Sequence, residues 1–286
     1  MIRKTFYFFT AGRLALSCTN KKASQQTTET MENELTMVVG TYTSGSSKGI
    51  YTFRFNQDTG DSKALSDTEM TNPSYLTISD DNQFVYAVSE VGDGSETVTA
   101  FKFDKEKGSL QKMNSVPAMG GSPCYVITAK QHVVTANYRG GSISVFPLAG
   151  DGSLLPASDV IQFTGSGVDK SRQEKPHLHC VRFSPDGNFV FANDLGTDLI
   201  YAFRTNAQAN NENGGKFLSA ANPPSFSVPP GSGPRHITFS PSGKQAYLIN
   251  ELSGAVIAFD YNDGMLSEIQ SIQADTVGAK GSADIH

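Results

Sequence analysis

Two sequence signals recur along this chain roughly every 50 residues, and this period constrains the fold more than any other feature. The first is a short turn that opens with serine and closes with asparagine or glycine. The second is an aromatic residue followed by a glycine turn. Pro presets one turn dihedral angle and Gly or Asn accepts positive φ, so both signals predict β-hairpins. The turns are residues 79–82, 184–187 and 240–243, and the aromatic residues are Phe55, Phe103, Phe146, Phe203 and Phe259.

Two hairpins per repeat give four strands per repeat, which is the make-up of a propeller blade. The segments 84–88, 189–192 and 246–249 follow the serine turns and are rich in β-branched and aromatic residues, as strands are. Five repeats are visible, and a sixth begins at residues 281–285, partway into a strand where the sequence stops. We therefore predict an all-β chain, a β-propeller of four-stranded blades with about five blades present.

The first 35 residues differ from the repeats and predict an export segment. Arg3 and Lys4 precede an apolar run, and residues 14–17 lead into Cys18 as in a bacterial lipoprotein signal. The polar residues up to 35 then predict a flexible tether. We expect an exported protein, periplasmic or lipid-anchored at Cys18, with a cytoplasmic protein as the alternative. Residues 36–286 are expected to form the propeller.

The formal net charge of −5 argues against nucleic acid as a partner. An anionic substrate would have to be held by a local cluster of basic groups. Cys124 and Cys180 match no zinc-binding spacing and are expected to be buried thiols. His and Glu are present, but no third ligand is spaced convincingly, so no metal site is predicted.

The innermost strands of a propeller line a central channel, and substrates commonly sit at one of its mouths. The same position of the repeat holds His179 in one blade and Arg235 in the next, so both side chains are expected to face the same mouth of the channel. Glu251 follows Arg235 across one hairpin, so the two can meet. An ion pair that ties strands together is the alternative explanation for this pair. Alignment through the turn serines makes Ser74, His179, Arg235 and Ala283 equivalent, and likewise Glu90, Leu195 and Glu251.

Five short motifs carry a family resemblance: residues 39–43, 136–142, 176–179, 233–236 and 250–251. As a set they resemble the seven-bladed-propeller lactonase family, the bacterial 6-phosphogluconolactonase type, over about residues 36–286. The fungal carboxymuconate-lactonising enzymes share this fold and are similar at the His, Arg and Glu positions. The resemblance also implies a further family Arg, which would lie past His286.

The resemblance implies a channel site built from His179, Arg235 and Glu251 that opens a sugar lactone without a cofactor. Lactone opening needs an activated water, charge stabilisation on the carbonyl oxygen and a proton for the leaving alkoxide. His179 can exchange a proton near neutral pH, and Arg235 can hold the oxyanion or a substrate phosphate. Glu251 can orient Arg235 or serve as the base. The candidate substrate contacts are His177, His236, Arg139 and Lys175.

Two other functions remain open at this point. A carboxymuconate-type lactonising enzyme would bind a carboxylate-rich substrate through Arg235 and His177. A non-catalytic propeller would bind a protein or glycan, because fold alone does not settle function. Separation of His179, Arg235 and Glu251 in the structure would exclude the catalytic interpretation. His236 has an alternative role as a structural histidine, and export would favour an unphosphorylated lactone.

Overall fold

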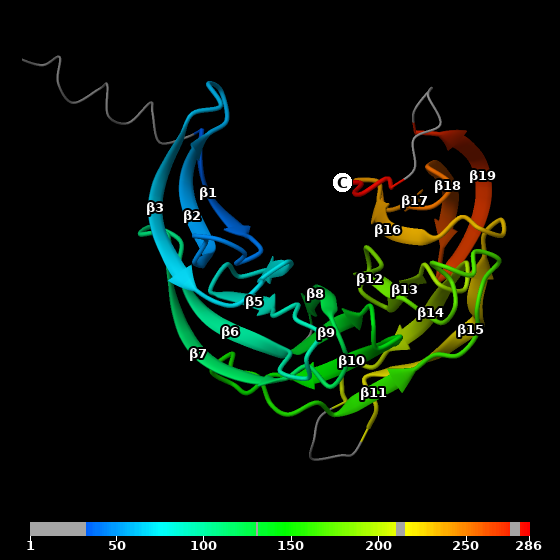
Figure 1. The fold of residues 1–286 in the computed structure, drawn as a ribbon, viewed down its shortest axis with the longest axis horizontal. Coiled ribbons are helices and arrows are strands. Elements are labelled where there is room, and N and C mark those ends of the chain that lie inside the picture. Colours follow the sequence, from blue (N-terminus) through cyan, green and yellow to red (C-terminus); the bar gives the residue numbers. More distant parts are fainter. Residues whose placement is uncertain (1–32, 130, 210–214, 275–280) are drawn as a thin grey trace, which may run out of the picture.

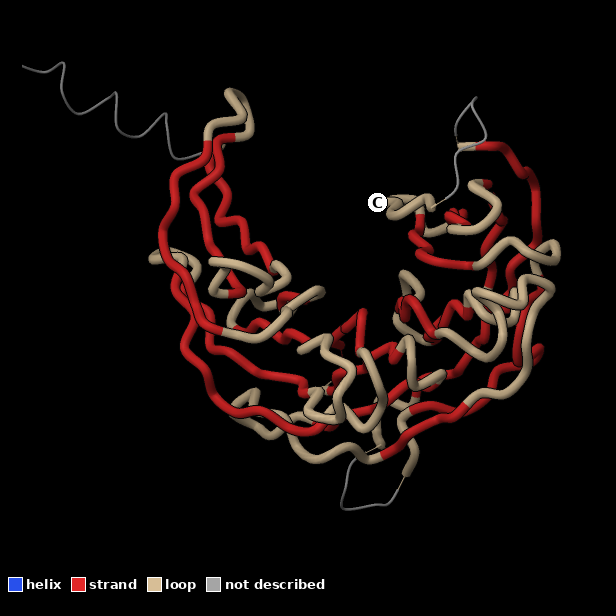
Figure 2. The backbone as a smooth tube through the Cα atoms, in the orientation of Figure 1, coloured by secondary structure: helices blue, strands red, loops and turns tan. Residues whose placement is uncertain are grey.

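The structure, a computed structural model, describes residues 33–129, 131–209, 215–274 and 281–286. These residues form strands, turns and loops and contain no helix (Figure 2). No membrane-spanning helix is therefore found in the described part of the chain. Five antiparallel sheets follow one another along the chain and stand around a common centre (Figure 1). This arrangement confirms the predicted all-β propeller with five blades.

Each sheet is one blade, numbered here in chain order. In blades 2 to 5 the first strand lies innermost, since the first strands of neighbouring blades contact one another. The blades are blade 1, β1(Glu34–Gly40), β2(Gly49–Asn56) and β3(Ser62–Glu69); blade 2, β4(Leu76–Ile78), β5(Phe84–Val88), β6(Thr97–Asp104) and β7(Ser109–Pro117); blade 3, β8(Pro123–Ala129), β9(His132–Asn137), β10(Ser142–Pro147) and β11(Asp159–Gln162); blade 4, β12(Leu178–Phe183), β13(Phe189–Asp194), β14(Leu199–Thr205) and β15(Leu218–Ser227); blade 5, β16(Pro234–Phe239), β17(Gln245–Asn250), β18(Ala255–Asn262) and β19(Met265–Gln273).

The predicted serine turns form as expected. In each one the closing residue donates its amide to the serine carbonyl at 2.8 Å. The closing residues Asn82, Gly187 and Gly243 all have positive φ, which explains why only Asn or Gly occurs there. The serine hydroxyl also accepts the amide of the first residue of the next strand, as Ser79 Oγ does from Phe84 at 2.9 Å.

Two expectations about the ends of the chain need correction, and a third lies outside the described residues. Blade 1 has three strands rather than four: Phe55 lies on β2 as Phe103 lies on β6, so β1–β3 match the outer three strands of blade 2. The first strand, β1, begins at Glu34, which pairs with Asn56. Residues 281–286 form no strand, although a strand was predicted to begin there; they contact blade 5 through Arg235 and His236. The signal-like segment with Cys18 lies outside the described residues.

A β-bulge at the inner end of blades 3, 4 and 5 decides where the central side chains point. In each of these blades the register between the first and second strands shifts by one residue. A bulge leaves one residue unpaired and re-aims its side chain. The unpaired residues are Cys124, His179 and Arg235. They come from three successive blades, and their side chains lie around one centre.

The glycine turns, the second repeating signal, are contact points between blades. A Cβ on Gly264 of blade 5 would lie 2.4 Å from the Phe189 ring of blade 4, and one on Gly152 would lie 2.5 Å from Phe84. Between the blades, buried aliphatic and aromatic side chains form the core, which includes Phe191, Ile200 and Leu248. Glycine is therefore required at these two turns, where an outer hairpin closes over the neighbouring blade.

We expect Gly264→Ala to lower the free energy of unfolding by about 2–4 kcal/mol, from strain at positive φ and overpacking against Phe189. Gly60→Ala is the matched control, because its φ is also positive but its Cβ would meet nothing within 4 Å. It should cost only about 1 kcal/mol. Urea unfolding of both variants measures the difference. Equal losses in the two variants would show that the contact between blades is not tight.

Candidate active site

A cavity of about 450 Å³ lies where the inner strands converge. This volume suits a small-molecule ligand. One part of its wall repeats from blade to blade and is called here the first ring: Ser74, Cys124, His179 and Arg235. In blades 3 to 5 these are the bulged residues, so the cavity exists because the bulges turn them inward.

A second repeated position, at the end of the next strand, completes the wall. The amides of Glu90, Tyr138, Leu195 and Glu251 donate to the carbonyl two residues before the first-ring residue, at 2.8–3.0 Å. This shared bond confirms the predicted equivalence of Glu90, Leu195 and Glu251. The residues of this position that line the cavity, called the second ring, are Tyr42, Glu90, Tyr138 and Glu251.

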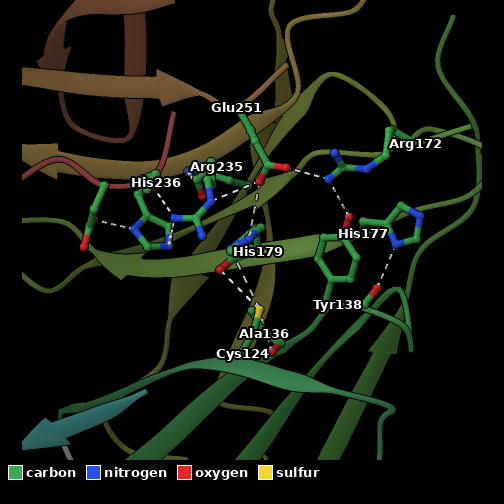
Figure 3. A network of polar contacts seen from close by, with 12 residues as sticks. Cys124, Ala136, Tyr138, Arg172, His177, His179, Arg235, His236 and Glu251 are labelled. Carbon is green, nitrogen blue, oxygen red and sulfur yellow. Dashed lines mark hydrogen bonds and ion pairs between the residues drawn. The ribbon is translucent and has the colours of Figure 1, made fainter. Parts of the chain in front are cut away.

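Glu251 is the centre of the polar network in the cavity (Figure 3). Its Oε2 accepts from Arg235 Nε at 3.0 Å, and its Oε1 accepts from Arg172 Nη2 at 2.5 Å. The same Oε2 lies 3.7 Å from His179 Nε2. The Glu251 side chain is only 14% exposed, so these interactions are weakly screened. The structure thus brings the three predicted catalytic side chains together in the central cavity.

His179 is a neutral imidazole in this setting. Burial, together with the charge of the neighbouring Arg235, lowers the pKa of His179 to about 3. Its Nδ1 lies 3.9 Å from Cys124 Sγ. Burial raises the pKa of Cys124, which keeps that group a thiol, and both Cys124 and Cys180 are buried as expected. Above the acid range, His179 therefore faces the cavity without charge.

The four predicted substrate contacts lie at different places. His236 lines the cavity; its Nδ1 is 2.5 Å from Asp284 Oδ1, and burial lowers its pKa. His177 does not line this cavity, because its ring stacks on Tyr138 and both ring nitrogens contact protein atoms. Arg139 and Lys175 also lie outside it and, together with His177, line a neighbouring cavity.

Arg172 is the most informative residue that the sequence did not reveal. It lies between β11 and β12, outside the blade repeat, so no alignment of repeats could find it. Asp198 holds this loop in place: its Oδ1 accepts from Gln173 Nε2 and from the Gly233 amide, both at 2.8 Å. One buried carboxylate therefore connects the loop carrying Arg172 to the segment that precedes Arg235.

Cys124, Tyr138 and Tyr42 were also missed, although each occupies a repeated position. The first two belong to blade 3, in which the sequence between β8 and β9 lacks the serine used to align the other blades. Tyr42 belongs to blade 1, in which the described residues include no innermost strand. Burial and the adjacent Glu90 raise the pKa of Tyr42 to about 12, and its hydroxyl donates to Glu90 Oε2 at 2.8 Å. Within the described residues no group of His, Cys, Asp or Glu is arranged to hold a metal ion.

The fold and the site together define a class of protein. It is a β-propeller in which a histidine, an arginine and a glutamate meet in a central cavity. The family described as "Lactonase, 7-bladed beta-propeller" matches residues 36–286. The chain belongs to this family.

Individual proteins that are similar to this chain carry lactonase names, in agreement with the family match. A 6-phosphogluconolactonase from Bacillus subtilis is 40% identical, with the match covering 82% of this chain and 66% of that protein. A crystal structure of a candidate 6-phosphogluconolactonase from Bacteroides fragilis is 60% identical with a TM-score of 0.88, covering 90% of this chain and 72% of that one. The structure of a periplasmic gluconolactonase from Pseudomonas aeruginosa is 36% identical with a TM-score of 0.78, covering 86% and 70%. This chain thus spans about two thirds of the length of the curated relative from Bacillus subtilis.

Proposed function

We propose that this chain is a lactone hydrolase of the 6-phosphogluconolactonase type, which opens a sugar lactone to the sugar acid. The observation that carries the proposal is the shared carboxylate of Glu251, which holds Arg172 and Arg235 beside His179 in one cavity. Family membership and the names of the relatives support the same chemistry.

Arg235 is suited to stabilise the oxyanion. Its Nε is fixed by Glu251, while its Nη1 donates to the carbonyl of Ala283, so the guanidinium is held from two sides. A donor that is already oriented costs no reorganisation when charge develops on the lactone oxygen. Both carboxylate oxygens of Glu251 accept from guanidinium groups, so Glu251 acts as a positioning residue rather than as the base.

His179 is the proposed proton carrier. Its Nε2 accepts a proton from water as the water oxygen bonds to the lactone carbonyl carbon. The ring C–O bond then breaks, the leaving alkoxide takes the proton from His179, and a sugar acid results. The low pKa makes His179 a weak base in the empty cavity. Negative charge on the adjacent lactone oxygen raises its proton affinity as the transition state forms.

The structure also bears on the two alternatives. A carboxymuconate-type substrate was expected to use His177 together with Arg235, but the His177 ring nitrogens contact the Tyr138 carbonyl and Glu174. In a non-catalytic propeller, a structural ion pair between Arg235 and Glu251 would not by itself account for His179 and Arg172 meeting the same carboxylate. Both observations support hydrolysis over these alternatives.

The test is lactone opening by the purified chain, followed as proton release with 6-phosphogluconolactone and gluconolactone. The wild type should exceed the spontaneous rate with at least one of the two lactones, and His179→Ala should not. Glu268→Gln, which changes an exposed carboxylate on β19, should match the wild type. A wild-type rate equal to the spontaneous rate with both lactones would refute the proposal.

A further inference from the structure

A second cavity of about 340 Å³ adjoins the central one, and Tyr138 and Arg172 line both. Its charged lining residues are Arg139, Arg172, Lys175 and Glu174. Three cations therefore face one carboxylate, in a chain whose net charge is −5. By contrast, the central cavity opposes two arginines with two glutamates.

Two of the three cations of the second cavity, Arg139 and Lys175, are available for a ligand, whereas Arg172 is paired with Glu251. In the part of the chain that the structure describes, neither Arg139 nor Lys175 forms an ion pair. Glu174, the one carboxylate there, already contacts His177 Nε2 at 3.1 Å. Both arginines of the central cavity, in comparison, bind Glu251. A dianion therefore meets less competition in the second cavity.

One contact with the backbone links Lys175 to the segment that carries Arg139. Lys175 Nζ donates to the Arg139 carbonyl at 2.8 Å, which holds the ammonium beside the strand end that carries Arg139. The Arg139 guanidinium lies against Gly92, where a Cβ would come within 2.7 Å of Nη1. Glycine at 92 thus leaves room for the arginine.

We propose that this second cavity, named here the anion pocket, binds the phosphate of a phosphorylated sugar lactone whose ring occupies the central cavity. The inference rests on the proposed function. A phosphate monoester carries a charge of about −1.5 to −2 at pH 7 and offers three strong acceptor oxygens. Arginine matches that geometry through paired donors, and lysine adds a compact charge. Arg172 lines both cavities, so the two parts of one ligand can be bound at once.

The test compares binding of the two product acids, 6-phosphogluconate and gluconate, by calorimetry. Binding of product does not require turnover, so the result is independent of catalysis. We expect the wild type to bind the phosphorylated acid at least about tenfold more tightly, the effect of one good charge-assisted contact. The double variant R139Q/K175Q should lose this preference. The matched control K63Q/K244Q removes two exposed lysines that line neither cavity and should keep it.

The ratio of kcat/KM for the two lactones gives a second readout. It should fall by about tenfold or more in R139Q/K175Q and stay unchanged in the control variant. A wild type without preference for the phosphorylated acid, or a double variant that retains it, would overturn the anion pocket. If the wild type opens neither lactone but its binding preference still depends on Arg139 and Lys175, the hydrolase proposal fails and the anion pocket stands.

Discussion

Glu251→Gln is expected to lower kcat/KM for lactone opening by about 100-fold or more, although the change removes no bulk. Glu251 is the shared acceptor of Arg172 and Arg235, with contacts of 2.5 Å and 3.0 Å. A glutamine has one acceptor oxygen and an amide that donates, so it can hold only one of the two guanidinium groups. The other is released, and the cavity gains one positive charge. Steady-state kinetics on the preferred lactone measures the effect.

The same variant separates positioning from base catalysis. If Glu251 only orients the arginines, Glu251→Asp should recover part of kcat, and the pH profile of the residual activity should keep its shape. If Glu251 is the base, the acid limb of that profile should disappear in Glu251→Gln. Glu268→Gln is the control for the loss of one carboxylate elsewhere. Near-wild-type activity in Glu251→Gln would contradict both roles.

The sequence predicted most of the fold because its signals are local. Each serine turn is built from its own hydroxyl, its own carbonyl and one residue that tolerates positive φ. Nothing outside the turn is needed to form it, so the period of these turns revealed the blades directly. Blade 1 was predicted less well, because the number of strands in a sheet depends on pairing with distant segments.

The site was predictable to the extent that it obeys the repeat. His179 and Arg235 occupy one position that recurs from blade to blade, and Glu251 follows Arg235 across one hairpin, so the sequence predicted that they lie close together. The family resemblance then implied that the three form a site. Arg172 obeys no repeat: Gln173 and Asp198 fix its loop through contacts between residues far apart in the chain. Long-range contacts of this kind leave no pattern in a single sequence.

The charge state of His179 was also beyond sequence analysis. From the sequence, His179 was expected to exchange a proton near neutral pH. In the structure, burial and the charge of Arg235 lower its pKa to about 3. Desolvation depends on how completely the surrounding blades exclude water from the side chain. The bulge at His179 is a feature of the pairing between β12 and β13, so it is visible only in the folded structure.

His179→Asn is expected to lower kcat/KM by about 1,000-fold, which is within the range for loss of a general acid–base group. The pH profile of the wild type should be flat through pH 6.5, because kcat/KM reports the free enzyme and His179 there has a pKa of about 3. His132→Asn is the control, since His132 is also buried but does not line the cavity. Half-loss of activity near pH 6.5 would contradict a neutral His179.

The same histidine should make the fold sensitive to acid. Its pKa is about 3 in the folded chain, against 6.5 for an unperturbed histidine, so between these values the unfolded chain binds a proton that the folded chain does not. The free energy of unfolding should therefore fall as the pH is lowered from 6.5 towards 3, with a slope of at most about 1.4 kcal/mol per pH unit from this residue. His179→Asn removes that contribution. Urea unfolding at pH values between about 7 and 4 should give a shallower acid slope for the variant, and parallel slopes would show that His179 is not held uncharged by the fold.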